Sequence, residues 1–367
     1  MAKLDFITPF YNEKHNQNTF VKKLDSLLAS EDVDVRAIPF GSLHNPVALF
    51  DGYDHGSRNV RLLKTGTGVS LFELTYLYKE NDKDRKAKGR FFVYEHPQYP
   101  SVYAAVTLED SSFYLRGLLP FIQGQYPKII QTFITHKKLR RLLEEFKTSN
   151  GFSELTIVRA SQRFRIRETD ERQKIVPVVS WPDMDLKEAF DWVYQNNGWF
   201  RSVKFEVKTP LSASASISLT RQGAVRMNHH CEKVFAGFVH PVFKTLHENI
   251  QIFGHRSRRD NVNLTAKPLT IDFGIEQFAD VEENKRFIQA MQLMGTASTS
   301  VIHGNPYIHL TVIDYYDGST FDLWVLSAHQ LIIVPQMKGS IAAIKRLINH
   351  IYDTYAEGDI KDYEVAV

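Results

Sequence analysis

The last hundred residues contain the pattern that restricts the fold of this chain most. Two apolar stretches, Tyr307–Asp314 and Thr320–Ser327, flank a polar segment in which Asp317-Gly318 is a strong signal for a hairpin turn. Gln330–Pro335 has the composition of a third strand, and Ser340 can cap a helix that follows it. The apolar positions of that helix share one face: Ile344, Leu347, Ile348 and Ile351. The sequence therefore predicts an antiparallel meander closed by an amphipathic helix.

The rest of the chain also alternates between strand-like and helix-like patterns. Ser112–Leu118 has the character of a strand, and Thr135 can cap a helix whose apolar stripe runs from Leu139 to Phe146. The polar segment Glu168–Lys174 marks a junction between domains. We therefore predict an α+β protein of two domains, residues 1–170 and 171–367, each with a mainly antiparallel sheet packed against amphipathic helices.

Composition excludes several classes of protein. The 367 residues are 43% hydrophobic and 24% charged, which is typical of a globular chain and not of a collagen-like or disordered one. Cys231 is the only cysteine, so an intrachain disulfide is impossible and a reducing cytoplasm is the expected compartment. No apolar run approaches the length of a membrane span, so we expect no membrane association.

The net charge of +3 conceals an uneven distribution. Residues 1–174 contain 27 Lys and Arg against 21 Asp and Glu, whereas residues 175–367 contain 18 against 21. Residues 136–174 are the most basic part, with 11 cations against 6 acids. Such asymmetry indicates a polyanionic partner for the first part of the chain.

Two neighbouring segments carry most of this basic charge. Arg163, Arg165 and Arg167 alternate with apolar residues, so in a strand they would project from one face about 6.5–7 Å apart. Upstream, four cations occupy the first turns of the predicted helix, where they oppose its dipole. These four are Lys137, Lys138, Arg140 and Arg141. The pattern predicts a DNA- or RNA-binding surface, although an ordinary solvated helix and sheet surface would have the same composition.

A second basic cluster lies in a predicted loop, at Arg256, Arg258 and Arg259. Arginine in a loop can place its guanidinium group on a phosphate, so we expect these residues to assist nucleic-acid binding. The C-terminal domain is predicted to contact a protein partner or a second copy of the chain.

One catalytic pattern is present in the sequence. Pro182-Asp183 precedes Glu206-Val-Lys208 at a distance that resembles PD-(D/E)xK nucleases. The resemblance implies that Asp183 and Glu206 hold Mg²⁺ while Lys208 orients or activates water. The segment between them has a helical pattern, however, whereas that nuclease core usually has a strand hairpin there. An exposed strand with alternating charges would also explain Glu206 and Lys208.

The sequence thus leaves three functions open. The first is a non-catalytic nucleic-acid-binding subunit, without metal or cofactor, in a multi-component nucleic-acid-processing or antiviral defence system. The second is a Mg²⁺-dependent nuclease that uses Asp183, Glu206 and Lys208. The third is a regulatory or scaffold protein with no role on nucleic acid.

Overall fold

The computed structural model describes residues 7–30, 33–164, 179–195, 198–209, 212–305 and 307–363. For residues 30, 163, 164, 179–183, 209 and 212–214 it describes the backbone alone. The chain divides into two compact units, unit 1 (Met1–Glu248) and unit 2 (Asn249–Val367), each built on its own sheet.

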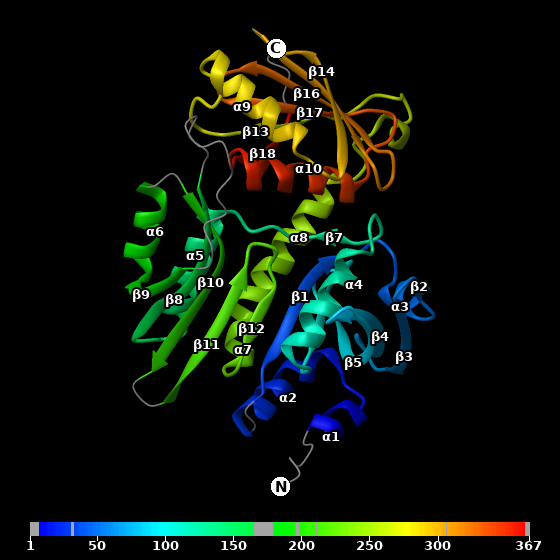
Figure 1. Cartoon of the computed structure of the whole chain (residues 1–367), viewed down its shortest axis with the longest axis vertical. Helices are drawn as coiled ribbons and strands as arrows, with labels where there is room; N and C mark the ends of the chain where they lie inside the picture. Colours follow the sequence, from blue (N-terminus) through cyan, green and yellow to red (C-terminus); the bar gives the residue numbers. More distant parts are fainter. Residues whose placement is uncertain are drawn as a thin grey trace. The chain divides into compact units, whose positions relative to one another are not determined.

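Unit 1 contains a twelve-stranded sheet in the order β2-β3-β4-β5-β6-β1-β12-β11-β10-β8-β9, with β7 paired to β1 beside β12 (Figure 1). All of its strand pairs are antiparallel. Its strands are β1 (Val35–Gly41), β2 (Asp54–His55), β3 (Arg58–Thr65), β4 (Val69–Glu80), β5 (Lys83–Glu95), β6 (Val102–Thr107), β7 (Ile130–Gln131), β8 (Glu154–Phe164), β9 (Val179–Asp185), β10 (Gly198–Thr209), β11 (Ser212–Thr220) and β12 (Val225–Met227).

Helices cover the two faces of this sheet unequally. The rear face packs against α1 (Ile7–Asn12), α2 (Gln17–Ser30), α5 (His136–Ser149), α6 (Leu186–Gln195), α7 (Cys231–Val234), the π-helix η2 (Phe235–Val239) and α8 (His240–Phe253). The front face packs against α3 (Pro46–Phe50), the π-helix η1 (Phe113–Leu118) and α4 (Leu119–Gln123), which lie only over the half formed by β1 and β3–β6. Among the described elements, none covers the front of β10, β11 and β12 (Figure 1).

The covered half of the front face holds an aromatic core. Phe50 of α3 lies 5.8 Å from the ring of Phe72 on β4 and 5.1 Å from that of Phe121 on α4. Phe91 on β5 stacks on Phe72 at 5.4 Å, and all four side chains are buried. Phe113 of η1 lies over Gly89, where an added Cβ would meet the ring at 2.3 Å, so the glycine allows η1 to approach the sheet.

Unit 2 contains a six-stranded antiparallel sheet in the order β14-β15-β16-β17-β13-β18. The strands are β13 (Leu269–Asp272), β14 (Ala297–His303), β15 (Ile308–Asp314), β16 (Thr320–Ser327), β17 (Gln330–Pro335) and β18 (Asp359–Asp362). Two amphipathic helices, α9 (Val281–Gln292) and α10 (Ile341–Thr354), bury their apolar sides, and a 3₁₀ turn, η3, spans Arg258–Asp260.

The predicted α+β class with antiparallel sheets and amphipathic helices is confirmed. The C-terminal meander matches closely, since β16 and β17 have the expected bounds and the Ser340 hydroxyl accepts the Ala343 amide at the start of α10. Thr135 likewise caps α5 by accepting the amide of Lys138 at 3.3 Å.

Two sequence-based expectations differ from the structure. The predicted domain boundary at 170/171 falls inside one sheet, because β8 before it pairs with β10 after it, and the compact units divide instead at Glu248/Asn249. The predicted strand Ser112–Leu118 is the π-helix η1. Phe113, Gly117 and Leu118 face the core from successive turns, and the Asp110 carboxylate accepts the Phe113 amide at the start.

None of the helices in the described ranges is both long and apolar enough to cross a lipid bilayer.

Candidate nucleic-acid interface

The cations predicted on the basic helix lie on α5, but most of them already have partners. Arg140 donates to Glu144 and to Asp191, each at 2.9 Å, and Arg141 lies 3.4 Å from Glu145. Such exposed ion pairs contribute little stability, yet they cancel most of the positive charge of the helix.

The start of α5 is more buried than its sequence suggests. Lys138 is half-buried and donates to the Thr245 hydroxyl of α8, and burial lowers the pKa of its ammonium group. Burial also lowers the pKa of His136 to about 4, so this imidazole is neutral at pH 7 and its Nδ1 accepts the Phe200 amide at 3.2 Å. Of the four predicted cations on α5, Lys137 and Arg141 are exposed.

The predicted arginine strand is described only in part. Arg165 and Arg167 lie outside the described residues, and for Arg163 the structure gives the backbone, which pairs with Trp199 of β10. The side chain of Asp183, the predicted metal ligand, is also outside the described part.

The predicted loop cluster separates into two kinds of arginine, all in unit 2. Arg256 is buried, where it donates to the carboxylate of Asp362 and to the carbonyl of Pro268. It therefore fastens the loop to the sheet. Arg258 and Arg259 are exposed on η3, and their backbone amides bond to the carbonyls of Gln336 and Met337.

The sheet of unit 1 assembles a different group of cations, which no single sequence segment contains. The register pairs Arg159 of β8 with Lys204 of β10, Lys204 with Ser218 of β11, and Ser218 with Arg226 of β12. These four residues form a line across four neighbouring strands, which we call the basic row. Arg226 is in turn paired with Arg36 of β1 at the border of the covered half.

The basic row lies on the open front face. Successive residues of a strand point to opposite faces, and the neighbours of Lys204, Val203 and Phe205, are buried. Phe205 contacts Phe238 and Phe146 on the rear helices, with ring centroids 5.7 and 6.2 Å apart. Lys204 must therefore point forward, away from α5 and η2.

Hydroxyl groups surround the basic row. Ser202 is paired with Ser161 and Thr220, and Ser216 is paired with Glu206, all on the same face as Ser218. The carboxylate of Glu206 lies on the same face further along β10, but the basic row and its immediate neighbours offer ammonium, guanidinium and hydroxyl groups to a ligand. These are the groups that proteins use on phosphate oxygens.

The charges of the basic row differ in how far they are neutralised. The Oδ2 atom of Asp34 lies 2.6 Å from Nη2 of Arg226 and 3.1 Å from Nη2 of Arg36, so one carboxylate is shared by two guanidinium groups. Arg159 and Lys204 make no ion pair with any residue of the described ranges, and Arg159 is exposed. The β8–β10 end of the row is thus the more positive one.

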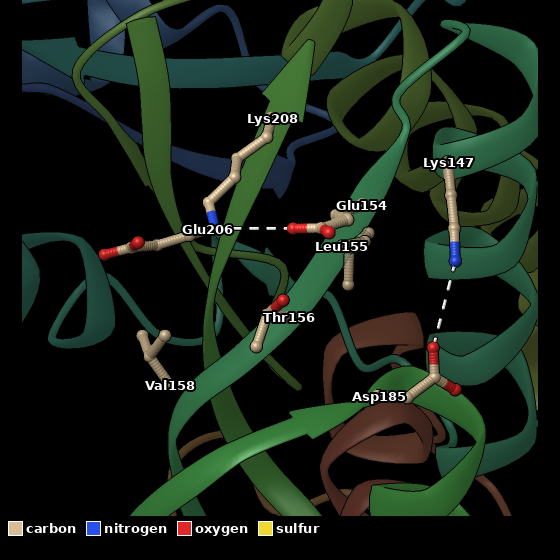
Figure 2. Close-up of a pocket in the computed structure, with 8 residues that line it drawn as sticks. All are labelled: Lys147, Glu154, Leu155, Thr156, Val158, Asp185, Glu206 and Lys208. Carbon is tan, nitrogen blue, oxygen red and sulfur yellow. Dashed lines mark ion pairs between the residues drawn. The ribbon is translucent and has the colours of Figure 1, made fainter. Parts of the chain in front are cut away.

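Further along β8 and β10 from Arg159 and Lys204 lies a pocket of about 360 Å³, which residues of both strands, of β9 and of α5 line. Its lining residues are Lys147, Glu154, Leu155, Thr156, Val158, Asp185, Glu206 and Lys208. Lys208 lies 3.3 Å from Glu154, and Lys147 of α5 lies 3.8 Å from Asp185 of β9. Figure 2 shows the Glu206 side chain directed away from Glu154.

The pocket contains two of the three residues predicted for a nuclease, Glu206 and Lys208. The register places Asp185 and Glu206 on either side of Thr156, on the two strands that flank β8. In the described residues, however, no three His, Cys, Asp or Glu side chains are grouped closely enough to hold a metal ion.

The basic row was missed at the level of sequence because its members are single cations in separate strands. Arg159 and Arg226 each stand alone between apolar or polar neighbours, and Lys204 belongs to a stretch of alternating charges with Glu206 and Lys208. The one available signal is that each cation occupies an outward position of an alternating strand. Neither a protein-family model nor a curated protein matches the sequence.

Proposed function

We propose that unit 1 binds the phosphate backbone of DNA or RNA on its open front face, in the cytoplasm and without catalysing a reaction itself. The observation that supports this proposal is the basic row, in which Arg159, Lys204 and Arg226 align with Ser218 on a face that no described helix covers. Arg159 and Lys204 make no ion pair within the described ranges and are paired with each other on neighbouring strands, an arrangement that a scaffold protein has no need of.

The spacing of the basic row suits a phosphate backbone. Neighbouring strands lie about 4.8 Å apart, so Arg159 and Lys204 are close enough to contact one phosphate or two consecutive ones. Arg226 lies two strands beyond Lys204, roughly 10 Å away, with the Ser218 hydroxyl between them. Contacts of this kind fix the position of a nucleic acid but carry no base information, so we expect little sequence preference.

The division into units strengthens this argument. Unit 1 contains 35 Lys and Arg against 28 Asp and Glu, whereas unit 2 contains 10 against 14. The positive charge of the chain therefore belongs to the unit that carries the basic row. A positive field around this unit would speed association with a polyanion at low salt.

The test is a salt titration of binding with the full chain. Fluorescence anisotropy would measure the affinity for labelled duplex DNA, single-stranded DNA and single-stranded RNA. The double variant Arg159→Gln, Lys204→Gln removes two phosphate contacts, so the slope of log affinity against log salt should fall by about 2. The matched control is Lys137→Gln, Arg141→Gln on α5, which removes the same charge and should leave the slope unchanged.

Two results would overturn the proposal. One is the absence of binding to any of the three probes at low salt. The other is an equal loss in the α5 control, which would show that only net charge matters. Incubation of the same probes with the chain and Mg²⁺ tests the nuclease alternative. Cleavage of the probes that disappears in Glu206→Ala would replace the proposal with that alternative.

A further inference from the structure

The two edges of the six-stranded sheet of unit 2 differ in length and charge. The edge strand β18 has four residues, of which Asp359, Lys361 and Asp362 are charged. The opposite edge strand, β14, has seven residues and contains no Lys, Arg, Asp, Glu or Pro. Short edges with charges resist pairing with another chain, whereas the uncharged stretch Ala297–Val301, whose register with β15 is unbroken up to the bulge between Val301 and His303, is open to it.

The side chains of β14 are exposed together with its edge. Among the described residues β14 pairs only with β15, so its second side presents unpaired backbone groups. Val301 and Ile302 are 43% and 59% exposed, and Ser298, Ser300 and His303 are exposed as well. Exposed β-branched residues on a free strand edge are the usual features of a surface that accepts a further strand.

We propose that β14 pairs with β14 of a second copy of this chain, in antiparallel orientation, so that two six-stranded sheets join into one. The backbone groups of a strand edge are best complemented by another strand edge. In a twofold dimer the same strand supplies both sides, so no other partner is required.

Two features of β14 favour a second copy over a different partner. Unit 2 has a small excess of acidic residues, and because β14 is uncharged, pairing two copies along this strand brings no like charges directly together. An antiparallel pairing centred on Ser300 would also set Thr299 of each copy opposite Val301 of the other. Cross-strand pairs of β-branched residues of this kind stabilise antiparallel sheets.

The test measures the mass of the full chain by size-exclusion chromatography with light scattering over a concentration series. The wild-type chain should elute as a dimer, and Ser300→Lys and Ile302→Lys should each shift it to a monomer. The matched control is Leu326→Lys, which replaces an equally exposed apolar residue on the interior strand β16 and should remain dimeric. Circular dichroism would confirm that the variants are folded.

The proposal is overturned by a wild-type chain that stays monomeric throughout the series. It is also overturned by a dimer that both β14 variants keep, or by one that Leu326→Lys loses equally. Hydrogen exchange of the wild-type chain tests the same point without a substitution, since amides of β14 should exchange more slowly as the concentration rises. Exchange that does not depend on concentration would contradict the proposal.

Discussion

The front face of the large sheet has two halves of opposite character. Over β3–β6 and β1 it carries Phe72, Phe91 and Ile38, which are buried under α3, η1 and α4. Over β12, β11, β10 and β8 the same face carries Arg226, Ser218, Lys204 and Arg159, and no described helix covers it.

Within one continuous sheet, the covered half of the front face contributes to the core, and we propose that the open half binds nucleic acid. On the rear face both halves pack against helices, so the whole sheet is anchored from that side. The front face is needed for the core only where η1 and α4 lie on it. In the other half the front positions can hold charged and hydroxyl side chains without loss of packing.

The largest effect is expected in the covered half. Phe50→Ala should lower the free energy of unfolding by about 3–5 kcal/mol, because Phe50 is fully buried among Phe72, Phe91 and Phe121. Chemical denaturation would measure this loss. The affinity of the folded fraction for nucleic acid should stay unchanged, and an affinity that falls with stability would erase the distinction between the halves.

The rear face should make the stability depend on pH. Burial, together with the nearby His240, lowers the pKa of His96 from 6.5 to about 4. The unfolded chain therefore binds a proton that the folded chain does not, and the stability should fall as the pH decreases from about 6.5 to about 4. The expected loss is about 3 kcal/mol, with a flat profile for this group above pH 7.

Denaturation curves over this pH range would measure the slope of that loss. The variant His96→Phe keeps a ring beside Tyr99 but cannot take up a proton, so its profile should be flatter. An identical slope in the variant would mean that His96 is not the responsible group.

In the open half an added charge should strengthen binding. Ser218→Arg places a guanidinium group between Lys204 and Arg226, where the basic row has a hydroxyl. The slope of log affinity against log salt should become steeper by about 0.9. Between 50 and 200 mM salt the affinity of the variant should therefore fall about three- to fourfold more than that of the wild-type chain. Anisotropy titrations would measure this slope. The control for added charge alone is Thr148→Arg, at an exposed position of α5. Equal gains in both variants would argue against a located interface.

The smallest effect should come from the hydroxyl itself. Ser218→Ala removes one neutral hydrogen bond to the ligand, so the affinity should fall by about 1 kcal/mol or less while the salt slope stays the same. The stability should hardly change, because Ser218 is half-exposed. A change in slope would show that the variant disturbs the neighbouring cations.

Sequence predicted best what depends on neighbouring residues. The caps at Thr135 and Ser340, the turn at Gly318 and the strands of the C-terminal meander are all local, and all are present. α7, η2 and α8 follow one another without a break from Cys231 to Phe253, so Pro241 lies within a continuous helical segment, just after the π-helix η2. The prediction of a strand at Ser112–Leu118 was wrong, because the aromatic and aliphatic residues of this segment fit a strand as well as a helix that faces the core.

The candidate site depends on register, which is not local. Arg159, Lys204 and Arg226 lie tens of residues apart, and a shift of one residue in any strand would move its cation to the rear face. The clustered cations of α5 were visible because they are adjacent in sequence, yet their acidic partners are adjacent as well, at Glu144 and Glu145. The clustering of cations in the sequence therefore predicted a more positive helix α5 than the structure contains. The cations of the sheet could not be recognised in the same way, because they are dispersed along the sequence.

The buried pair of Asp314 and Arg346 limits how unit 2 can be divided. Arg346 of α10 donates to both carboxylate oxygens of Asp314, at 2.9 and 2.7 Å, and both side chains are almost inaccessible to solvent. Breaking such a pair by loss of one partner typically costs 3–5 kcal/mol, because a charge stays buried without compensation. A recombinant fragment that stops before α10 should therefore not hold the meander, and any soluble fragment of unit 2 must include both residues.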